Sequence, residues 1–280
     1  MNKILLILMT FGLLSSGLFA YSDSDMDGVA NSVDKCPNTP LTDLVDINGC
    51  SIKKLSVKKA SKGHADVIIG ANFSDSNYAT LNQTDTYSGS LQMDYYYGNF
   101  SLQASTSYYK TTTKNSSDED GLNDSFIGAA YNFRPIRNLS LRLGAGALLP
   151  TYQTSLNNNN TDYTGSASLS YTVAKINIFG GYSYTMINDD DVNTTNTNYI
   201  YQDTNAYSAG LGYYFTNKLY MSGAYNLSNS IYKGVEDIQT ASLYGYYSID
   251  KSRFLILSYA YGLSDSASDN ALSLKVGYYF

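Results

Sequence analysis

A short acidic segment near the start of the chain has the spacing of a calcium-binding loop. Calcium is a hard cation that binds about six to eight oxygen atoms, so closely spaced carboxylates must converge on one point. Gly28 stands where such a loop turns sharply, and the last ligand position holds Asp where Glu is usual, which shortens the bidentate arm. The predicted calcium ligands are Asp23, Asp25, Asp27, the Val29 carbonyl, Asn31 and Asp34. The alternative interpretation is a solvated acidic turn.

The first residues have the features of an export signal. Lys3 gives a positive start, residues 4–14 are apolar, and small residues lead to a cleavage point after Ala20. The apolar stretch is too short for a convincing spanning helix. We therefore expect residues 1–20 to be a signal peptide.

Both cysteines, Cys36 and Cys50, lie just after the acidic residues. In an exported protein, two cysteines this close together favour a disulfide. Closing a loop of this size stabilises it by roughly 3 kcal/mol in the chain-entropy model. Asp46 and Asn48 lie inside the loop, where they are equally well explained as ligands of a second calcium site or as turn residues.

The run from Asp23 to Pro37, with its continuation to Cys50, resembles a thrombospondin type 3 repeat of the kind also found in OmpA-type envelope proteins. The resemblance covers about thirty residues, a normal repeat length. It implies a rigid calcium-binding module at residues 21–50. There is one such repeat and no peptidoglycan-binding domain follows, so the resemblance implies nothing beyond calcium binding and rigidity. A basic linker, residues 51–64, follows the module.

From residue 65 to residue 280 the sequence alternates apolar and polar residues, as β-strands do when they present two different faces. In one predicted strand, Tyr163, Leu169 and Tyr171 share a face, and small hydroxyl residues share the other. We count about twelve strands of roughly 9–11 residues, which is long enough for a tilted strand to cross a bilayer. A soluble β-sandwich is the alternative, but charges almost vanish from both strand faces. The predicted fold is all-β, a transmembrane antiparallel up-and-down β-barrel.

The connections between predicted strands alternate between short and long, which is typical of a barrel with periplasmic turns and external loops. The pattern also requires an even number of strands, and it places the first and last residues of the barrel segment on the periplasmic side. The short connections are residues 97–99, 134–138, 175, 216–218 and 250–252, and the long ones are residues 74–84, 112–122, 150–161, 187–204, 228–237 and 264–270.

The last strand ends the chain with Tyr278 and Phe280 on an apolar face. An aromatic terminus after alternating apolar residues resembles the C-terminal signature of bacterial outer-membrane barrel proteins. The resemblance implies that the barrel-assembly machinery reads Tyr278 and Phe280, and that the protein resides in outer-membrane lipid with the N-terminal module in the periplasm.

Few charges are predicted to face the barrel lumen, and all of them lie in its periplasmic third. They are Asp66, Asp94, Arg142 and Lys275, and Asp66 and Lys275 fall on the two strands that must pair to close the barrel. We expect these pore-lining charges either to set conductance and ion preference or merely to neutralise one another.

The sequence predicts a porin-like channel for small polar solutes, or a structural or adhesive protein whose lumen is plugged. Catalysis is not expected, because the single histidine, His64, precedes the first predicted strand and has no nucleophile beside it. The net charge of -6 argues against a nucleic-acid partner.

Overall fold

The structure is a computed structural model that describes residues 23–25, 29, 31, 34–39, 44–53, 63–78, 82–114, 118–153, 158–194 and 197–280. The predicted signal peptide, Asp27 and most of the basic linker lie outside the described residues. Within the described part, no helix has the length and apolar character needed to cross a bilayer.

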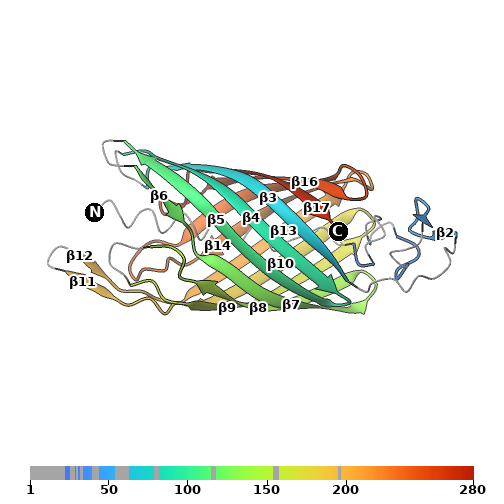
Figure 1. Cartoon of the computed structure of the whole chain (residues 1–280), viewed down its shortest axis with the longest axis horizontal. Helices are drawn as coiled ribbons and strands as arrows, with labels where there is room; N and C mark the ends of the chain where they lie inside the picture. The colour runs from blue at the N-terminus through green and yellow to red at the C-terminus, as the bar shows by residue number, and fades with distance from the viewer. Residues whose placement is uncertain are drawn as a thin grey trace.

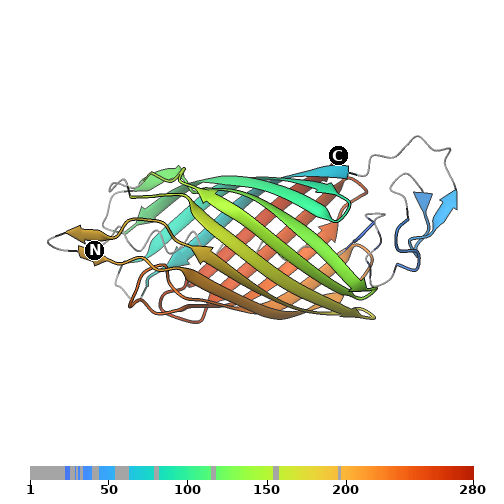
Figure 2. The same cartoon turned by 90° about the horizontal axis from the view of Figure 1, so that it is seen from below.

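A closed antiparallel β-barrel forms the body of the protein (Figures 1 and 2). Thirteen strands belong to one sheet, of which twelve encircle the lumen and the other, β6 (Glu119–Leu122), pairs with β5 at its end. The wall strands are β3 (Gly63–Ser76), β4 (Thr84–Tyr97), β5 (Phe100–Thr113), β7 (Ser125–Ile136), β8 (Leu139–Leu149), β9 (Asp162–Val173), β10 (Ile176–Met186), β13 (Thr204–Tyr214), β14 (Leu219–Ser228), β15 (Ile238–Ser248), β16 (Arg253–Gly262) and β17 (Asn270–Tyr279).

The first and last wall strands close the barrel. β17 pairs antiparallel with β3, from Asn270 opposite Asp75 to Tyr279 opposite Asp66, and β4 pairs with β5 to complete the ring. Each wall strand therefore has a partner on both sides, and no edge is left open to the surroundings. This closure confirms the predicted fold class.

Side chains alternate between the outside and the lumen along each wall strand. In β9, Tyr163, Leu169 and Tyr171 are exposed, whereas Thr164 and Thr172 point inward and are half-buried or buried. The predicted division of this strand into two faces is confirmed.

The outer surface of the barrel carries an apolar band bordered by aromatic rings. Exposed aliphatic side chains occupy the middle of the strands, among them Ile69, Leu91, Leu169, Leu243, Leu257 and Leu274. Exposed tyrosine and phenylalanine side chains lie nearer the strand ends, among them Tyr87, Tyr163, Tyr207 and Tyr261 at one end and Tyr97, Phe100, Tyr213 and Tyr247 at the other. Such a band matches the hydrocarbon core and the two interfaces of a bilayer.

Short turns join the strands at one end of the barrel, and long loops join them at the other (Figure 1). The turns are residues 98–99, 137–138, 174–175, 215–218 and 249–252, which confirms the predicted alternation. The described N-terminal module, with β1 (Leu44–Val45) and β2 (Ser51–Lys53), lies at the turn end, as does the C-terminus (Figures 1 and 2).

Several strand limits differ from those predicted. The wall strands run from 10 to 14 residues, because they continue beyond the apolar band into hydrogen-bonded hydroxyl pairs such as Thr86 with Thr111. β7 continues through Pro135 to Ile136, with an irregular register that accommodates the proline. β3 begins at Gly63, so His64 is part of the first strand and does not precede it. One long loop forms a small hairpin of β11 (Val192–Thr194) and β12 (Thr197–Tyr199).

Candidate functional site

The lumen of the barrel contains two cavities that share part of their lining. The cavity toward the loop end has a volume of about 270 Å³, and serine, threonine and asparagine residues are numerous in its lining beside apolar ones such as Phe126 and Leu148. The cavity toward the turn end has a volume of about 1020 Å³ and is lined by charged and aromatic residues. Six residues line both cavities, namely Ile68, Gln92, Gln103, Arg142, Ser168 and Lys275. We call this group the junction layer.

Two of the predicted lumenal charges, Arg142 and Lys275, belong to the junction layer. Arg142 projects from β8, where its Nη2 donates a hydrogen bond to Ser101 Oγ at 3.3 Å. Lys275 projects from β17, beside Gly70 of β3. Both side chains are half-buried and line the lumen as predicted.

The two predicted lumenal carboxylates lie next to each other, closer to the turn end. Asp66 and Asp94 are direct partners in the β3–β4 register and are only 5% and 7% exposed. Asp94 Oδ2 accepts a hydrogen bond of 2.7 Å from Gln92 Nε2, and Asp66 Oδ1 lies 3.8 Å from His64 Nε2. The imidazole ring of His64 stacks on Tyr96 with ring centroids 4.6 Å apart. Both carboxylates are therefore covered by neighbouring side chains.

Aromatic side chains fill one half of the lumen at the turn end. They come from the consecutive strands β13 to β17 and pack around Ile68 of β3. Tyr246 and Tyr279 join their hydroxyl groups at 2.9 Å, and the Phe254 ring lies 4.7 Å from the Tyr279 ring. The members of this group, which we call the aromatic half-wall, are Ile68, Tyr214, Tyr220, Tyr244, Tyr246, Phe254, Ile256 and Tyr279.

Glycine residues on adjacent strands make room for these rings. A Cβ at Gly277 would lie 2.0 Å from Phe254 Cζ, and one at Gly212 would lie 2.1 Å from the Tyr220 hydroxyl oxygen. The rings therefore lie flat against bare backbone, an arrangement that covers a glycine in a sheet. The aromatic half-wall was not predicted from the sequence, because alternation assigns a tyrosine to the inner face without showing that inward rings from several strands gather together. The sequence signal that could have indicated this cluster is the occurrence of inward aromatic residues on one strand and glycines on the neighbouring strand.

The long loops bind one another at the opposite end of the barrel. Asn160 N donates to Asp189 Oδ1 at 2.8 Å, and Asn188 N donates to Asp162 Oδ1 at 2.7 Å, so two loops are joined through asparagine and aspartate side chains. Ile231 and Tyr232, between β14 and β15, are buried and pack against Ile187, Tyr199 and Tyr201 between β10 and β13. These contacts give the loop end a fixed shape around the mouth of the lumen.

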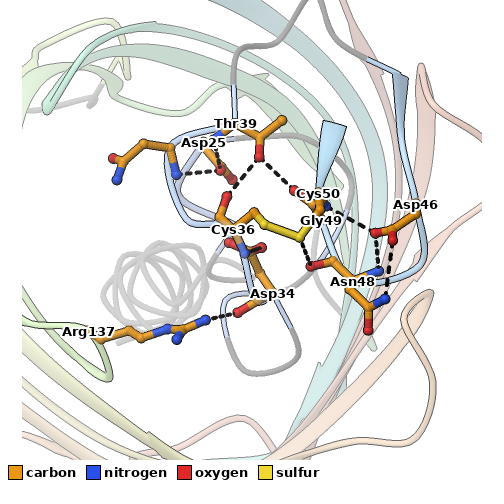
Figure 3. Close-up of a disulfide and its surroundings, with 10 residues drawn as sticks. Asp25, Asp34, Cys36, Thr39, Asp46, Asn48, Gly49, Cys50 and Arg137 are labelled. Carbon is orange, nitrogen blue, oxygen red and sulfur yellow. Dashed lines mark hydrogen bonds between the residues drawn. A yellow bond between two sulfur atoms is a disulfide. The ribbon is translucent and has the colours of Figure 1, made fainter. Parts of the chain in front are cut away.

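The predicted disulfide between Cys36 and Cys50 is present and closes the N-terminal module (Figure 3). Thr39 lies at the centre of the closed loop, where its hydroxyl contacts the carbonyl oxygens of Cys36 at 2.7 Å and Gly49 at 2.6 Å. Asp46 accepts hydrogen bonds from the backbone N–H groups of Asn48 and Cys50, which lowers the pKa of its carboxyl. These hydrogen bonds hold the turn from Asp46 to Cys50.

The acidic residues of the module have an uneven set of partners. Asp25 Oδ2 accepts hydrogen bonds from the N–H groups of Asn38 and Thr39, at 2.7 and 2.6 Å. Asp34 Oδ1 accepts one from Cys36 N at 2.7 Å, and Asn31 Oδ1 accepts one from Ser24 N at 2.9 Å. The other carboxylate oxygens, Asp25 Oδ1 and Asp34 Oδ2, are buried and accept no hydrogen bond within the described part of the chain.

These two buried oxygens would suit a bound cation, which would replace the missing hydrogen bonds. Burial raises the pKa of Asp34, and the nearby Asp25 carboxylate raises it further against the opposing effects of the Cys36 N–H and Arg137. Asp27 lies outside the described residues. Among the residues that are described, no group of three acidic, histidine or cysteine side chains converges as a metal site. The calcium loop therefore stays a prediction.

The module contacts the turn end of the barrel. Arg137, in the β7–β8 turn, donates a hydrogen bond from Nη2 to the Asp34 carbonyl oxygen (Figure 3). Arg134 interacts electrostatically with Asp23 and Asp25 of the module. Module residues also line the larger cavity, among them Asp23, Val29 and Asp46. The acidic module and the basic β7–β8 turn are thus complementary in charge.

The comparisons with known proteins agree with this architecture. An outer-membrane channel from Pseudomonas putida F1 has a similar structure, with a TM-score of 0.66 and 10% sequence identity over 81% of this chain and 100% of that chain. The NanC porin is similar with a TM-score of 0.51 and 15% identity over 76% of this chain and 98% of that chain. At these identities the similarity shows the fold, which is that of outer-membrane porin-like barrels. No family model matches the chain.

One sequence relative shares a short segment with this protein. Outer membrane porin F of Pseudomonas aeruginosa PAO1 is 66% identical over 29 residues, which are 10% of this chain and 8% of that porin. The match therefore spans a small part of that porin's length.

Proposed function

We propose that this protein is a passive, porin-like channel of a bacterial outer membrane that admits small polar solutes. The observation that carries the proposal is the pair of cavities that share a lining inside a closed barrel with an apolar exterior. A barrel of about eight strands is filled by its own side chains, whereas porins of about 16–18 strands hold wide pores. Twelve wall strands stand between these limits and suit a narrow pore.

The proposed solutes are small and uncharged or weakly charged, because hydroxyl and amide side chains dominate the cavity toward the loop end. Such groups can exchange hydrogen bonds with a passing solute without holding it tightly. The proposed location rests on the exposed aliphatic band and its aromatic borders, which would be costly to leave in water.

Single-channel recording of the refolded full-length protein in a planar bilayer tests the channel. We expect steady current, and we expect liposomes that contain the protein to swell in small sugars or amino acids. The adjacent residues Ser166 and Gly165 of β9 give a matched pair of variants, since Ser166 lines the lumen and Gly165 faces outward. Ser166→Trp should lower the conductance and Gly165→Trp should leave it unchanged. Equal effects of the two variants would reject the proposed path.

A structural or adhesive protein with a plugged lumen is the second candidate. It is favoured by one observation, namely that residues of the N-terminal module line the cavity at the turn end. A protein that folds in lipid, as judged by heat-dependent gel mobility, but passes no current would support this alternative. Steady wild-type current would reject it.

We also propose that the module binds calcium through Asp23, Asp25, Asp27, the Val29 carbonyl, Asn31 and Asp34. Support comes from the spacing of these residues and from the buried oxygens of Asp25 and Asp34 that accept no hydrogen bond among the described residues. Calcium titration calorimetry of the full-length protein should detect binding in the wild type and in Asp46→Asn. Binding should be lost in the double variant Asp25→Asn/Asp34→Asn. An unchanged isotherm in that double variant would reject the site.

The C-terminal strand is proposed to be the segment that the barrel-assembly machinery reads. Tyr278 and Phe280 are exposed on the outer surface and contact each other, with ring centroids 4.8 Å apart. Phe280→Ala should reduce the amount of assembled barrel in the outer membrane of an expressing bacterium. Phe215→Ala, which removes another exposed ring at the turn end, is the control and should assemble normally. Equal assembly of both variants would contradict this role.

A further inference from the structure

We propose that the junction layer is a binding site for small anionic solutes, held by Arg142 and Lys275. The inference rests on the proposed channel function and adds a class of substrate to it. The six residues that line both cavities include these two cations and no carboxylate. A solute that moves between the two cavities must pass this layer.

The two cations come from well-separated parts of the wall. In the ring of twelve wall strands, β8 is the fifth strand from β17 when the strands are counted through β3, β4, β5 and β7. Counted in the other direction, β8 is the seventh strand from β17. Lys275 on β17 and Arg142 on β8 therefore approach the lumen from nearly opposite sides. An anion between them would be attracted from both sides, and a cation would be repelled from both.

The nearby carboxylates offset this field only in part for a solute in the junction layer, because neither of them lines that layer. Asp94 lies on β4, between the two cations, and interacts electrostatically with both. Its Oδ2 is occupied by Gln92 Nε2 at 2.7 Å, and the side chain is 7% exposed. Asp66 is 5% exposed, and the imidazole of His64 lies beside its carboxylate. Both carboxylates line the larger cavity, but they are more fully covered than Arg142 and Lys275 and do not belong to the junction layer.

The chemistry of the two cations suits oxyanions. The planar guanidinium of Arg142 can donate two parallel hydrogen bonds to a carboxylate, and the ammonium of Lys275 acts as a point charge with several donors. Gln92, Gln103 and Ser168 complete the layer with groups that can bind the remaining polar atoms of a solute. Among the small, weakly charged solutes of the proposed channel, small carboxylates and similar oxyanions of low net charge are therefore the proposed substrate class.

Reversal potentials of the full-length protein in a planar bilayer, under a gradient of potassium chloride, test this inference. We expect the wild type to prefer chloride over potassium. Each of Arg142→Gln and Lys275→Gln should lower the anion-to-cation permeability ratio by about threefold, as expected for a unit charge several ångströms from the ion path in water. Asp94→Asn should raise the ratio. Arg253→Gln is the matched control, because Arg253 is an exposed cation paired with Asp250 at a turn, outside the junction layer.

The outcomes separate this inference from the channel on which it rests. A folded protein that passes no current would overturn the channel and the anion site with it. Steady current without anion preference, or a ratio unchanged in the double variant Arg142→Gln/Lys275→Gln, would overturn only the anion site. Heat-dependent gel mobility shows for each variant that the barrel has folded.

Discussion

The barrel and the N-terminal module hold their folds in different ways. Each wall strand of the barrel is hydrogen-bonded on both sides, and its apolar side chains face outward. The module has one disulfide, two short strands and a set of turns held by Thr39, Asp25 and Asp46. The barrel therefore depends on its lipid surroundings, whereas the module depends on a covalent link and on a few buried polar groups.

The largest expected effect comes from placing a charge on the lipid-facing surface. Leu243 lies in the middle of β15 and is 58% exposed. Leu243→Arg should destabilise the barrel by about 2–4 kcal/mol, the cost of a cation near the middle of a bilayer. Urea unfolding in lipid vesicles measures the change. The adjacent inward residue gives the control, and Ser242→Arg should cost much less while altering conductance. Similar losses in both variants would contradict the assignment of the two faces.

Removing the disulfide should destabilise the module and leave the stability of the barrel unchanged. Cys36→Ser/Cys50→Ser is expected to destabilise the module by roughly 3 kcal/mol, because the open chain regains conformational entropy. The chain contains no tryptophan, so Ile47→Trp, at a residue 80% exposed, gives a fluorescent reporter confined to the module. In the variant without the disulfide, the fluorescence of the reporter should no longer show a cooperative unfolding transition of the module. The heat-dependent gel mobility of the barrel should stay the same. A barrel that weakens together with the module would show that they fold as one unit.

Acidification should strengthen the module when calcium is absent. The folded-state pKa of Asp34 is raised, mainly by burial, so the folded module binds a proton more readily than the unfolded chain. Stability should therefore rise as pH falls from neutral toward about 4, and Asp34→Asn should remove this dependence. Urea titration of the Ile47→Trp reporter in EDTA measures both proteins. A wild-type module that weakens over this range would contradict the assignment.

The contact between the module and the barrel should give the smallest effect. Arg137 donates one hydrogen bond to the Asp34 carbonyl oxygen, and such a bond contributes about 1 kcal/mol. Arg137→Ala should shift the docked module toward the undocked state by about fivefold. Cross-linking between the module and the β7–β8 turn measures the shift. Lys175→Ala, in another turn at the same end, serves as the control and should leave the cross-linking yield unchanged.

The sequence predicts the barrel well because its strands obey a local rule. Alternation along β9 assigns each side chain to a face, and the order of short and long connections fixes the topology. The lumenal positions of Arg142 and Lys275 follow from the same rule. The position of the module against Arg137 could not be predicted, because that contact joins residues 103 apart in the chain and has no local pattern. His64 was misplaced because a basic linker and the start of a strand look alike in composition.

The aromatic half-wall gives the larger cavity two unlike sides. Tyrosine and phenylalanine rings cluster on the arc from β13 to β17, whereas the facing arc carries polar side chains such as Gln92, Gln103 and Ser168 together with fewer rings, among them Tyr96. If the proposed channel conducts, we expect a permeant with one apolar edge and one polar edge to enter it in a preferred orientation, so that molecules of equal size would be separated by how their polarity is distributed.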